Sequence, residues 1–308
     1  MHDQSKAYLY GIATVLLWST VASAFKLSLR YLDYTQLLLY ASIVSLFALV
    51  VILGLQGKIK VLFSYSSKQY LRSMLLGFLN PFLYYVVLLK AYELLPAQEA
   101  QPLNYTWAIT LALLSIPLLR QRISLKDIVA MLVSYSGVYV ISTHGDVTGF
   151  HFSNPFGVAL ALGSTLIWAL YWIYNTSDDR DPVAGLCLNF LFGLPWVLVF
   201  CLLFSKDWGL PPRGLLGAAY VGLFEMGVTF VFWLNALKLS ESTAKVGNLI
   251  FLSPFLSLVF IHFFVGEDIR TSTLVGLVLI VAGILIQQSK QRPTKLEDPA
   301  SDGEKSPP

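Results

Sequence analysis

Charged residues are scarce in this chain. Asp, Glu, Lys and Arg together make up 13% of its 308 residues, while hydrophobic residues make up 56%. A soluble domain ordinarily carries about 25% charged residues, which it needs to keep its surface hydrated. The mean hydropathy of +0.66 points the same way. These shortages exclude an ordinary soluble protein and indicate an integral membrane protein.

Cysteine and histidine are equally rare, with two and four residues. Cys187 and Cys201 fall on one expected helix, about 21 Å apart at 1.5 Å per residue, so they cannot form a disulfide with each other. We interpret both as apolar filling.

The motifs of common enzymes are also missing from the sequence. It has no phosphate-binding Gly-Lys-Ser/Thr loop, no His-Glu-x-x-His pair, no Gly-x-Ser-x-Gly elbow and no Cys/His spacing typical of a metal site. The net charge of +3 has no basic stripe with interleaved aromatics, which argues against a nucleic-acid partner. We therefore expect no cofactor, no metal and no enzymatic activity.

Long apolar stretches take up most of the chain. Most of them reach the roughly 17–25 residues that a helix needs to cross a bilayer, and each is continuously apolar rather than alternating as in a barrel strand. The sequence predicts an all-α integral membrane protein with ten transmembrane helices. The stretches lie near 7–29, 35–54, 70–93, 97–118, 126–143, 155–175, 183–205, 213–237, 245–265 and 271–288.

The chain states one plan twice. The segment Thr14-Val-Leu-Leu-Trp18 resembles Ser164-Thr-Leu-Ile-Trp168, and Gly77-Phe-Leu resembles Gly222-Leu-Phe about 145 residues later. Each copy holds five apolar stretches, and an odd number of spans reverses the direction of the second copy. We therefore predict two inverted five-helix repeats, a design typical of carriers with a central binding site.

These repeats define the domain organisation. The first covers 7–143 and the second 155–288, with a short loop between them. The segment 289–308 is polar and rich in proline, so we expect a disordered cytoplasmic tail. The first apolar stretch imitates a signal peptide ending at Ala22-Ser-Ala24, but its length and its similarity to the stretch around Trp168 favour a retained helix.

The positions of Lys and Arg predict the orientation. Most of them, including Lys58, Lys60 and Lys68, fall in connections on the same side as the two termini. The positive-inside rule then predicts a multi-pass protein of the cell (inner) membrane with both termini in the cytoplasm.

Polar residues at mid-membrane depth are the main functional signal. Glu225 lies halfway along its stretch, where a carboxylate costs several kcal/mol unless it is protonated, paired or hydrated. Thr229 and Trp233 follow it at helical spacing. Asn80 occupies the matching position of the first copy, and Tyr84 extends its face. Glu225 is a candidate for binding a substrate ammonium or exchanging a proton; the alternative is a protonated acid that bonds a neighbouring helix.

A further polar face belongs to the fourth stretch. Gln101, Asn104 and Tyr105 share this face, which is too polar to contact lipid and must contact protein or water. On the ninth stretch, Asn248 is the polar residue that we expect to face this side of the fourth stretch. Asn80 and Asn104 can equally serve as hydrogen bonds between helices, and aromatic residues in membranes often only pack. The expected lining of a central cavity is Trp18, Asn80, Tyr84, Asn104, Trp107, Trp168, Glu225, Trp233 and Asn248.

Several charges map to the ends of the stretches that face away from the termini. Lys26, Lys90, Glu93 and Glu99 could form an outer gate of ion pairs. Lys90 and Glu93 are also one helical turn apart, which is the spacing of an ordinary surface pair.

With these residues in place, the chain resembles the drug/metabolite transporter superfamily, in its branch with EamA repeats. The resemblance covers about 7–288 and is clearest in the second copy. It rests on the order of Ala236-Leu-Lys-Leu-Ser240, Pro254-Phe-Leu, Gly266-Glu267-Asp-Ile, Gly276 and Gly283. It implies a ten-helix carrier that exports small molecules.

The first copy departs from this family's pattern. Gln121 stands where the counterpart of Glu267 is usual, and Ile109 where that of Pro254 is. Asn104-Tyr-Thr-Trp107 is similar to a stretch of the superfamily's amino-acid exporters, without its final proline. The resemblance thus implies amino acids or related metabolites as the substrate.

Our leading hypothesis is a secondary carrier that works by alternating access in the lipid bilayer, with protons as a candidate coupling ion. Two alternatives stay open. A membrane-embedded transferase acting on lipid-linked substrates would need an acidic cluster at one interface, for which Asp178-Asp-Arg-Asp181 is the candidate. A non-transporting membrane scaffold is the other. The sequence leaves the substrate, direction, coupling ion and oligomeric state open.

Overall fold

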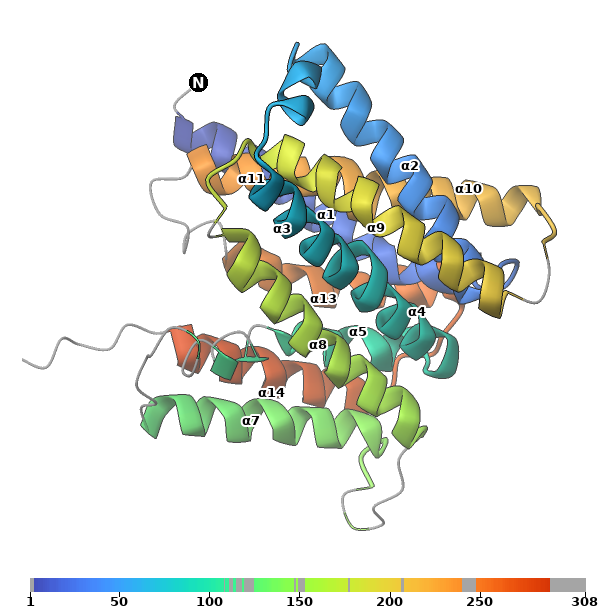
Figure 1. Ribbon diagram of the computed structural model, residues 1–308. Helices are drawn as coiled ribbons and strands as arrows, with labels where there is room; N and C mark the ends of the chain where they lie inside the picture. The colour runs from blue at the N-terminus through green and yellow to red at the C-terminus, as the bar shows by residue number, and fades with distance from the viewer. Residues whose placement is uncertain are drawn as a thin grey trace, which may run out of the picture.

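The computed structural model describes residues 3–107, 109–110, 113–114, 118, 125–146, 148, 153–176, 178–205, 208–239 and 248–288. These residues form a helical bundle without strands (Figure 1). The expected tail at 289–308, together with Gln121 and Lys245, lies outside the described residues.

Each of the ten expected stretches contains helix. Within the part of the chain that the structure describes, six helical spans are long and apolar enough to cross a membrane, and three shorter apolar helices accompany them. The prediction of an all-α integral membrane protein is confirmed. The helices are α1 (Asp3–Ser28), α2 (Tyr34–Leu55), α3 (Ser67–Gly77), α4 (Tyr84–Leu94), α5 (Ala97–Tyr105), α7 (Leu125–Ser142), α8 (Pro155–Thr176), α9 (Pro182–Phe204), α10 (Pro212–Val221), α11 (Val228–Leu239), α13 (Ser253–Phe260) and α14 (Thr271–Gln288).

Two of the spans are interrupted at mid-length by π-type turns. The segment η2 (Phe78–Leu83) joins α3 to α4, and η3 (Gly222–Gly227) joins α10 to α11. Inside η2 the backbone of Asn80 leaves the helical region, with φ −149° and ψ 120°, just before Pro81. The two interruptions occupy matching positions of the two copies. Asn80 and Glu225 therefore sit at irregular backbone, where functional residues of membrane helices are often found.

The remaining short elements flank the ninth span and the second connection. The segments η4 (Asn248–Leu252) and η5 (Ile261–Val265) precede and follow α13. The short turn η1 (Ile59–Phe63) lies between α2 and α3.

Aspartates fix the beginnings of two equivalent helices. Asp33 Oδ1 accepts hydrogen bonds of 2.9 Å from the backbone amides of Thr35 and Gln36 at the start of α2. Asp181 Oδ1 does the same for Val183 and Ala184 at the start of α9, at 3.0 and 3.1 Å. Each side chain satisfies amides that have no partner within the helix. The duplication thus extends to the helix caps.

Packing between the helices follows the duplication. Helix α1 packs against α11, and its counterpart α8 packs against α4, while α2 and α9 lie against each other. Figure 1 shows α7 and α14 side by side at one edge of the bundle. These two run antiparallel, since early residues of one contact late residues of the other, as expected for the equivalent last helices of inverted copies.

The contact between α7 and α14 is close because small residues line it. A Cβ at Gly137 would lie 2.4 Å from the carbonyl oxygen of Gly276, and one at Gly283 would lie 2.6 Å from that of Ala130. Gly137 matches Gly283, and Ala130 matches Gly276, so one contact is made twice. Small residues of this kind let the backbones of membrane helices approach each other.

Large apolar side chains remain exposed on the outside of the bundle. Phe47 on α2, Leu132 on α7 and Leu203 on α9 are 69%, 68% and 72% exposed. In water such surfaces would be unfavourable, whereas lipid tails solvate them. The polar residues considered next lie on the opposite, inward faces.

Candidate functional site

Aromatic and polar residues of both copies meet in the middle of the bundle. We call them the central cluster and define it by their mutual ring contacts and hydrogen bonds. Its members are Trp18 on α1, Tyr84 and Tyr85 on α4, Asn104 on α5, Trp168 on α8, Glu225 in η3, and Phe230 and Trp233 on α11.

Glu225 is the ionisable group of this cluster. Its side chain is almost buried, with 9% of the residue exposed. The hydroxyl of Tyr85 donates a hydrogen bond of 3.0 Å to Glu225 Oε1. The indole Nε1 of Trp18 lies 3.5 Å from the Glu225 backbone carbonyl oxygen. A buried carboxyl with a single hydroxyl partner can still bind a cation or exchange a proton.

Aromatic rings surround this carboxyl. Trp168 stacks on Tyr84 with ring centroids 4.5 Å apart. Phe230 lies edge-on to Trp18 with ring centroids 6.1 Å apart, and tilted against Trp168 at 5.8 Å. Trp18 and Trp168 are equivalent in the duplication, so the two copies contribute matching walls. Such walls suit the apolar part of a small ligand.

Two of the three amides predicted to line the cavity, Asn80 and Asn104, have described side chains, and these differ in their bonding. Asn104 Nδ2 donates to Ser164 Oγ at 3.0 Å and lies 3.4 Å from the hydroxyl of Tyr84. Asn80 is 1% exposed, and neither its Nδ2 nor its Oδ1 has a hydrogen-bond partner. An unpartnered buried amide costs about 1–3 kcal/mol, so Asn80 has free capacity to bind a polar group.

A second polar layer joins three helices beside the cluster. The hydroxyl of Tyr105 on α5 donates to Ser253 Oγ on α13 at 2.8 Å, and Ser19 on α1 lies 3.3 Å from the same oxygen. Ser257 donates to Gln101 Oε1. The expectation that the polar face of the fourth stretch contacts protein is confirmed for Gln101, Asn104 and Tyr105.

Three predicted residues stand apart from this arrangement. Trp107 packs half-buried against the hydrophobic core just beyond the end of α5. The hydroxyl of Thr229 donates a hydrogen bond of 2.5 Å to the backbone carbonyl of Phe224. Asn248 begins η4, but its side chain lies outside the described part of the chain.

Two members of the cluster were missed by the sequence reasoning. Tyr85 and Phe230 lie within apolar runs, where an aromatic residue ordinarily signals only packing. They are separated by about the same 145 residues as Asn80 and Glu225. Comparing the copies position by position would have singled them out.

The end of the bundle opposite the N-terminus of α1, which we call the far end, carries a charged network. Glu99 is fully buried, and its Oε1 lies 2.6 Å from Arg270 NH1 and 2.7 Å from His144 Nε2. Ser153 Oγ donates to Glu99 Oε2 at 2.6 Å. Lys90 pairs with Glu93, as their spacing predicts. Glu99 thus pairs with Arg270 and His144 rather than with one of the predicted lysines, and the ordinary surface pair of Lys90 and Glu93 is the part of the expected gate that is present.

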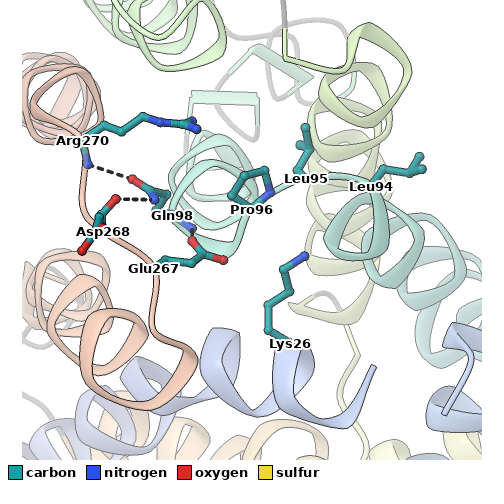
Figure 2. A pocket seen from close by; sticks show the side chains of 8 residues that line it. All are labelled: Lys26, Leu94, Leu95, Pro96, Gln98, Glu267, Asp268 and Arg270. Carbon is teal, nitrogen blue, oxygen red and sulfur yellow. Dashed lines mark hydrogen bonds between the residues drawn. The ribbon is translucent and has the colours of Figure 1, made fainter. Parts of the chain in front are cut away.

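A pocket of about 560 Å³ opens beside this network (Figure 2). It lies between α1, the connection from α4 to α5, and the connection from α13 to α14. The residues that line it are Lys26, Leu94, Leu95, Pro96, Gln98, Glu267, Asp268 and Arg270.

The acidic cluster at the other end is occupied by structural contacts. Arg180 NH2 lies 2.5 Å from Asp178 Oδ2, and Arg180 NH1 donates to Ser73 Oγ at 2.8 Å. Asp181 caps α9 and pairs with Lys58 at 2.7 Å. Among the described residues, no group of three His, Cys, Asp or Glu could hold a metal ion. These contacts explain the cluster as the join between α3 and the connection from α8 to α9.

Comparisons with known proteins agree with this architecture. The profile of the EamA-like transporter family matches residues 5–143 and 155–287. The chain is similar to YvbV, an uncharacterized transporter of Bacillus subtilis, with 27% identity over 91% of each chain. An uncharacterized transporter of Clostridium kluyveri is 28% identical over 209 residues, which cover 61% of this chain and 66% of that protein.

A solved structure shares the fold. One crystal structure, of a protein 22% identical in sequence, superimposes with a TM-score of 0.61 and covers 92% of this chain and 96% of its own. At this identity the likeness concerns the arrangement of helices alone.

Proposed function

Because the chain belongs to the EamA-like transporter family, which makes it a membrane transporter, we propose that it is a secondary carrier that exports amino acids or related small metabolites by alternating access. The observation that carries the proposal is the buried Glu225 carboxyl inside an aromatic cluster built by both copies. A carboxyl and aromatic rings suit a ligand with an ammonium group and an apolar part.

Different residues of the proposed site contact different parts of the substrate. Asn80 and Asn104 orient its polar groups, and the rings of Trp18, Tyr84 and Trp168 cover its apolar part. Trp107, Trp233 and Asn248 complete the proposed lining. Glu225 binds the ammonium group or carries a proton, because burial favours the neutral form of an acid and a bound cation favours the charged form.

The proposed orientation follows the distribution of Lys and Arg. Both termini face the cytoplasm of a cell whose inner membrane holds the protein. The far end with its charged network then faces outward. Matching interruptions at η2 and η3 would allow the two copies to rock around the central cluster.

Counterflow in proteoliposomes tests this function. Proteoliposomes that contain the purified protein are loaded with a mixture of unlabelled amino acids. Uptake of each labelled amino acid is then measured with and without a pH gradient. We expect Glu225→Gln to lower the exchange rate at least about tenfold, the cost of one charged hydrogen bond, and to abolish any response to the gradient. Glu93→Gln, at an exposed ion pair, is the matched control and should exchange normally.

Two outcomes would contradict the proposal. Exchange by Glu225→Gln at the wild-type rate at every pH would remove Glu225 from the mechanism. Absence of counterflow for every amino acid in the wild type would remove the substrate class, while leaving the chain a member of its transporter family.

A further inference from the structure

We propose that the pocket at the far end is a second binding site, which takes a small zwitterion such as a free amino acid. Lys26 binds its carboxylate, Glu267 binds its ammonium group, and Pro96 contacts its side chain. The inference rests on the proposed function, because it makes this pocket a station that the substrate occupies on its way to or from the central cluster.

The pocket has the size and the mixed lining of a metabolite site. Its volume of about 560 Å³ lies within the range of roughly 300–1,000 Å³ typical of ligand pockets. Pro96 and the adjoining chain of Leu94 and Leu95 border one side, with the Leu95 side chain packed against Gly157 of α8, while charged residues come from α1 and from the connection between α13 and α14. Apolar and charged groups are therefore separated within one cavity.

The ammonium group of Lys26 has spare hydrogen-bonding capacity. It donates 2.6 Å to the backbone carbonyl of Tyr92, at the end of α4, and an ammonium group has three donors. Among the described carboxylates none forms an ion pair with Lys26. Lys26 lies in the last turn of α1, where a long side chain can reach the polar surroundings of the pocket.

Glu267 faces Lys26 across the pocket and is held in place. Its Oε1 accepts from the amide of Ala97 at 2.8 Å and its Oε2 from that of Gln98 at 3.1 Å, at the start of α5. These bonds keep the carboxylate away from Lys26, and Figure 2 shows both charged groups directed into the pocket. Each oxygen retains a lone pair that can accept a ligand N–H. Fixed opposite charges across a gap complement a zwitterion.

Gln98 and Arg270, which also line the pocket, are already engaged and act as walls. Gln98 Nε2 donates to the carbonyl of Asp268 at 2.9 Å, and Gln98 Oε1 accepts from the amide of Arg270 at 2.9 Å. The guanidinium of Arg270 is bonded to Glu99 on the outside of the pocket. These bonds tie the connection between α13 and α14 to α5. Lys26 and Glu267 thus remain as the opposed charges of the pocket, with the exposed carboxylate of Asp268 beside Glu267 on the acidic side.

Binding to the full-length protein tests the assignment of charges. L-leucine is the probe because its side chain suits the apolar wall; leucinamide lacks the carboxylate, and 4-methylpentanoate lacks the ammonium group. Calorimetry in phosphatidylcholine nanodiscs is done in a Glu225→Gln background, which disables the proposed central site. We expect Lys26→Met to weaken L-leucine binding about ten- to a hundredfold, the loss of one charge-assisted bond, and Lys26→Arg to weaken it less.

The analogues and a control complete the design. Lys26→Met should leave the affinity for leucinamide unchanged, and Lys90→Met, which removes a lysine of the same end outside the pocket, should bind all probes as the parent does. Equal affinity of Lys26→Met and its parent for L-leucine, or no binding by the parent, would overturn the inference.

A labelling experiment locates the site independently of transport. Both native cysteines are buried, so a cysteine introduced as Leu94→Cys is the target of a small thiol reagent. L-leucine should slow its labelling, but not that of Leu210→Cys, an exposed position in the connection between α9 and α10. Protection by glycerophosphoethanolamine and not by L-leucine would reassign the pocket to lipid headgroups and overturn the inference. If L-leucine protects this cysteine but the protein exchanges no amino acid in counterflow, the proposed function is contradicted while the second binding site is supported.

Discussion

Single residues decide which copy carries the ionisable chemistry. Asn80 and Glu225 stand at matching positions, yet the amide has no partner while the carboxyl accepts a hydrogen bond from Tyr85. Position and polarity of both residues follow from the sequence, because a polar residue at mid-membrane depth is conspicuous. The hydrogen bond of Glu225 does not follow from the sequence, because its partner Tyr85 lies on a helix of the other copy.

The ion pair of Asp178 and Arg180 is predicted to stabilise the fold. The side chains are 10% and 2% exposed. Replacing Arg180 by Met leaves the carboxylate of Asp178 without its main partner, which we expect to cost about 3 kcal/mol. Thermal unfolding in detergent, followed by a dye that reacts with the buried Cys187 and Cys201 as they become exposed, measures the change. Asp179→Asn, at the exposed neighbour, should melt like the wild type.

The same pair gives stability a dependence on pH. Burial alone would raise the pKa of Asp178, but its hydrogen bonds with Arg180 and the nearby positive charges outweigh burial and hold the pKa below its ordinary value of 3.8. Its contribution is therefore complete above pH 3.8 and is lost as the pH falls through the lower folded-state pKa. Arg180→Met should lack this acid-dependent loss. An unchanged melting temperature in Arg180→Met would contradict both expectations.

At the scale of elements, two spans owe their shape to π-type turns. Pro81 explains the first, since proline lacks an amide hydrogen and frees a carbonyl. No proline marks the second: η3 contains Gly222, Glu225 and Gly227, and it ends where Thr229 bonds the carbonyl of Phe224. The sequence alone therefore predicts the interruption at η2 but gives no local signal for the one at η3. The duplication is the signal that links them.

Close packing beside η3 can be tested at Gly222. A Cβ there would lie 2.4 Å from the carbonyl oxygen of Ala41 on α2, whereas one at Gly163 on α8 would meet nothing within 4 Å. Gly222→Ala should therefore destabilise the protein by about 1–3 kcal/mol, because backbone cannot move aside as easily as a side chain. Gly163→Ala should be neutral or slightly stabilising, since alanine favours helix. Equal melting temperatures of the two variants would refute the close contact.

At the scale of the whole molecule, helices of each copy pack against helices of the other copy. Helix α1 of the first copy packs on α11 of the second, and α8 of the second packs on α4 of the first. The central cluster consequently lies between the copies. A relative movement of the two would change its exposure, as alternating access requires.

The proposed topology places both termini on one side of the membrane. Alkaline phosphatase, which is active only outside the cytoplasm, should be inactive when fused to either terminus of the full chain. Insertion of the same reporter after Leu210, in the connection between α9 and α10, should give activity. Activity at one terminus alone would mean an odd number of spans and would rule out the ten-helix arrangement.

The sequence by itself determined the membrane character and the helical class, and it predicted the duplication and the depth of Glu225 and Asn80. These depend on composition, run length and spacing, which are local properties of the chain. Only the tertiary structure decided which residues meet. The stacking of Tyr84 on Trp168, the bond between Tyr85 and Glu225, and the pocket between Lys26 and Glu267 join helices distant in sequence. The rotation and tilt of those helices depend on side-chain packing between the copies, which no local pattern encodes.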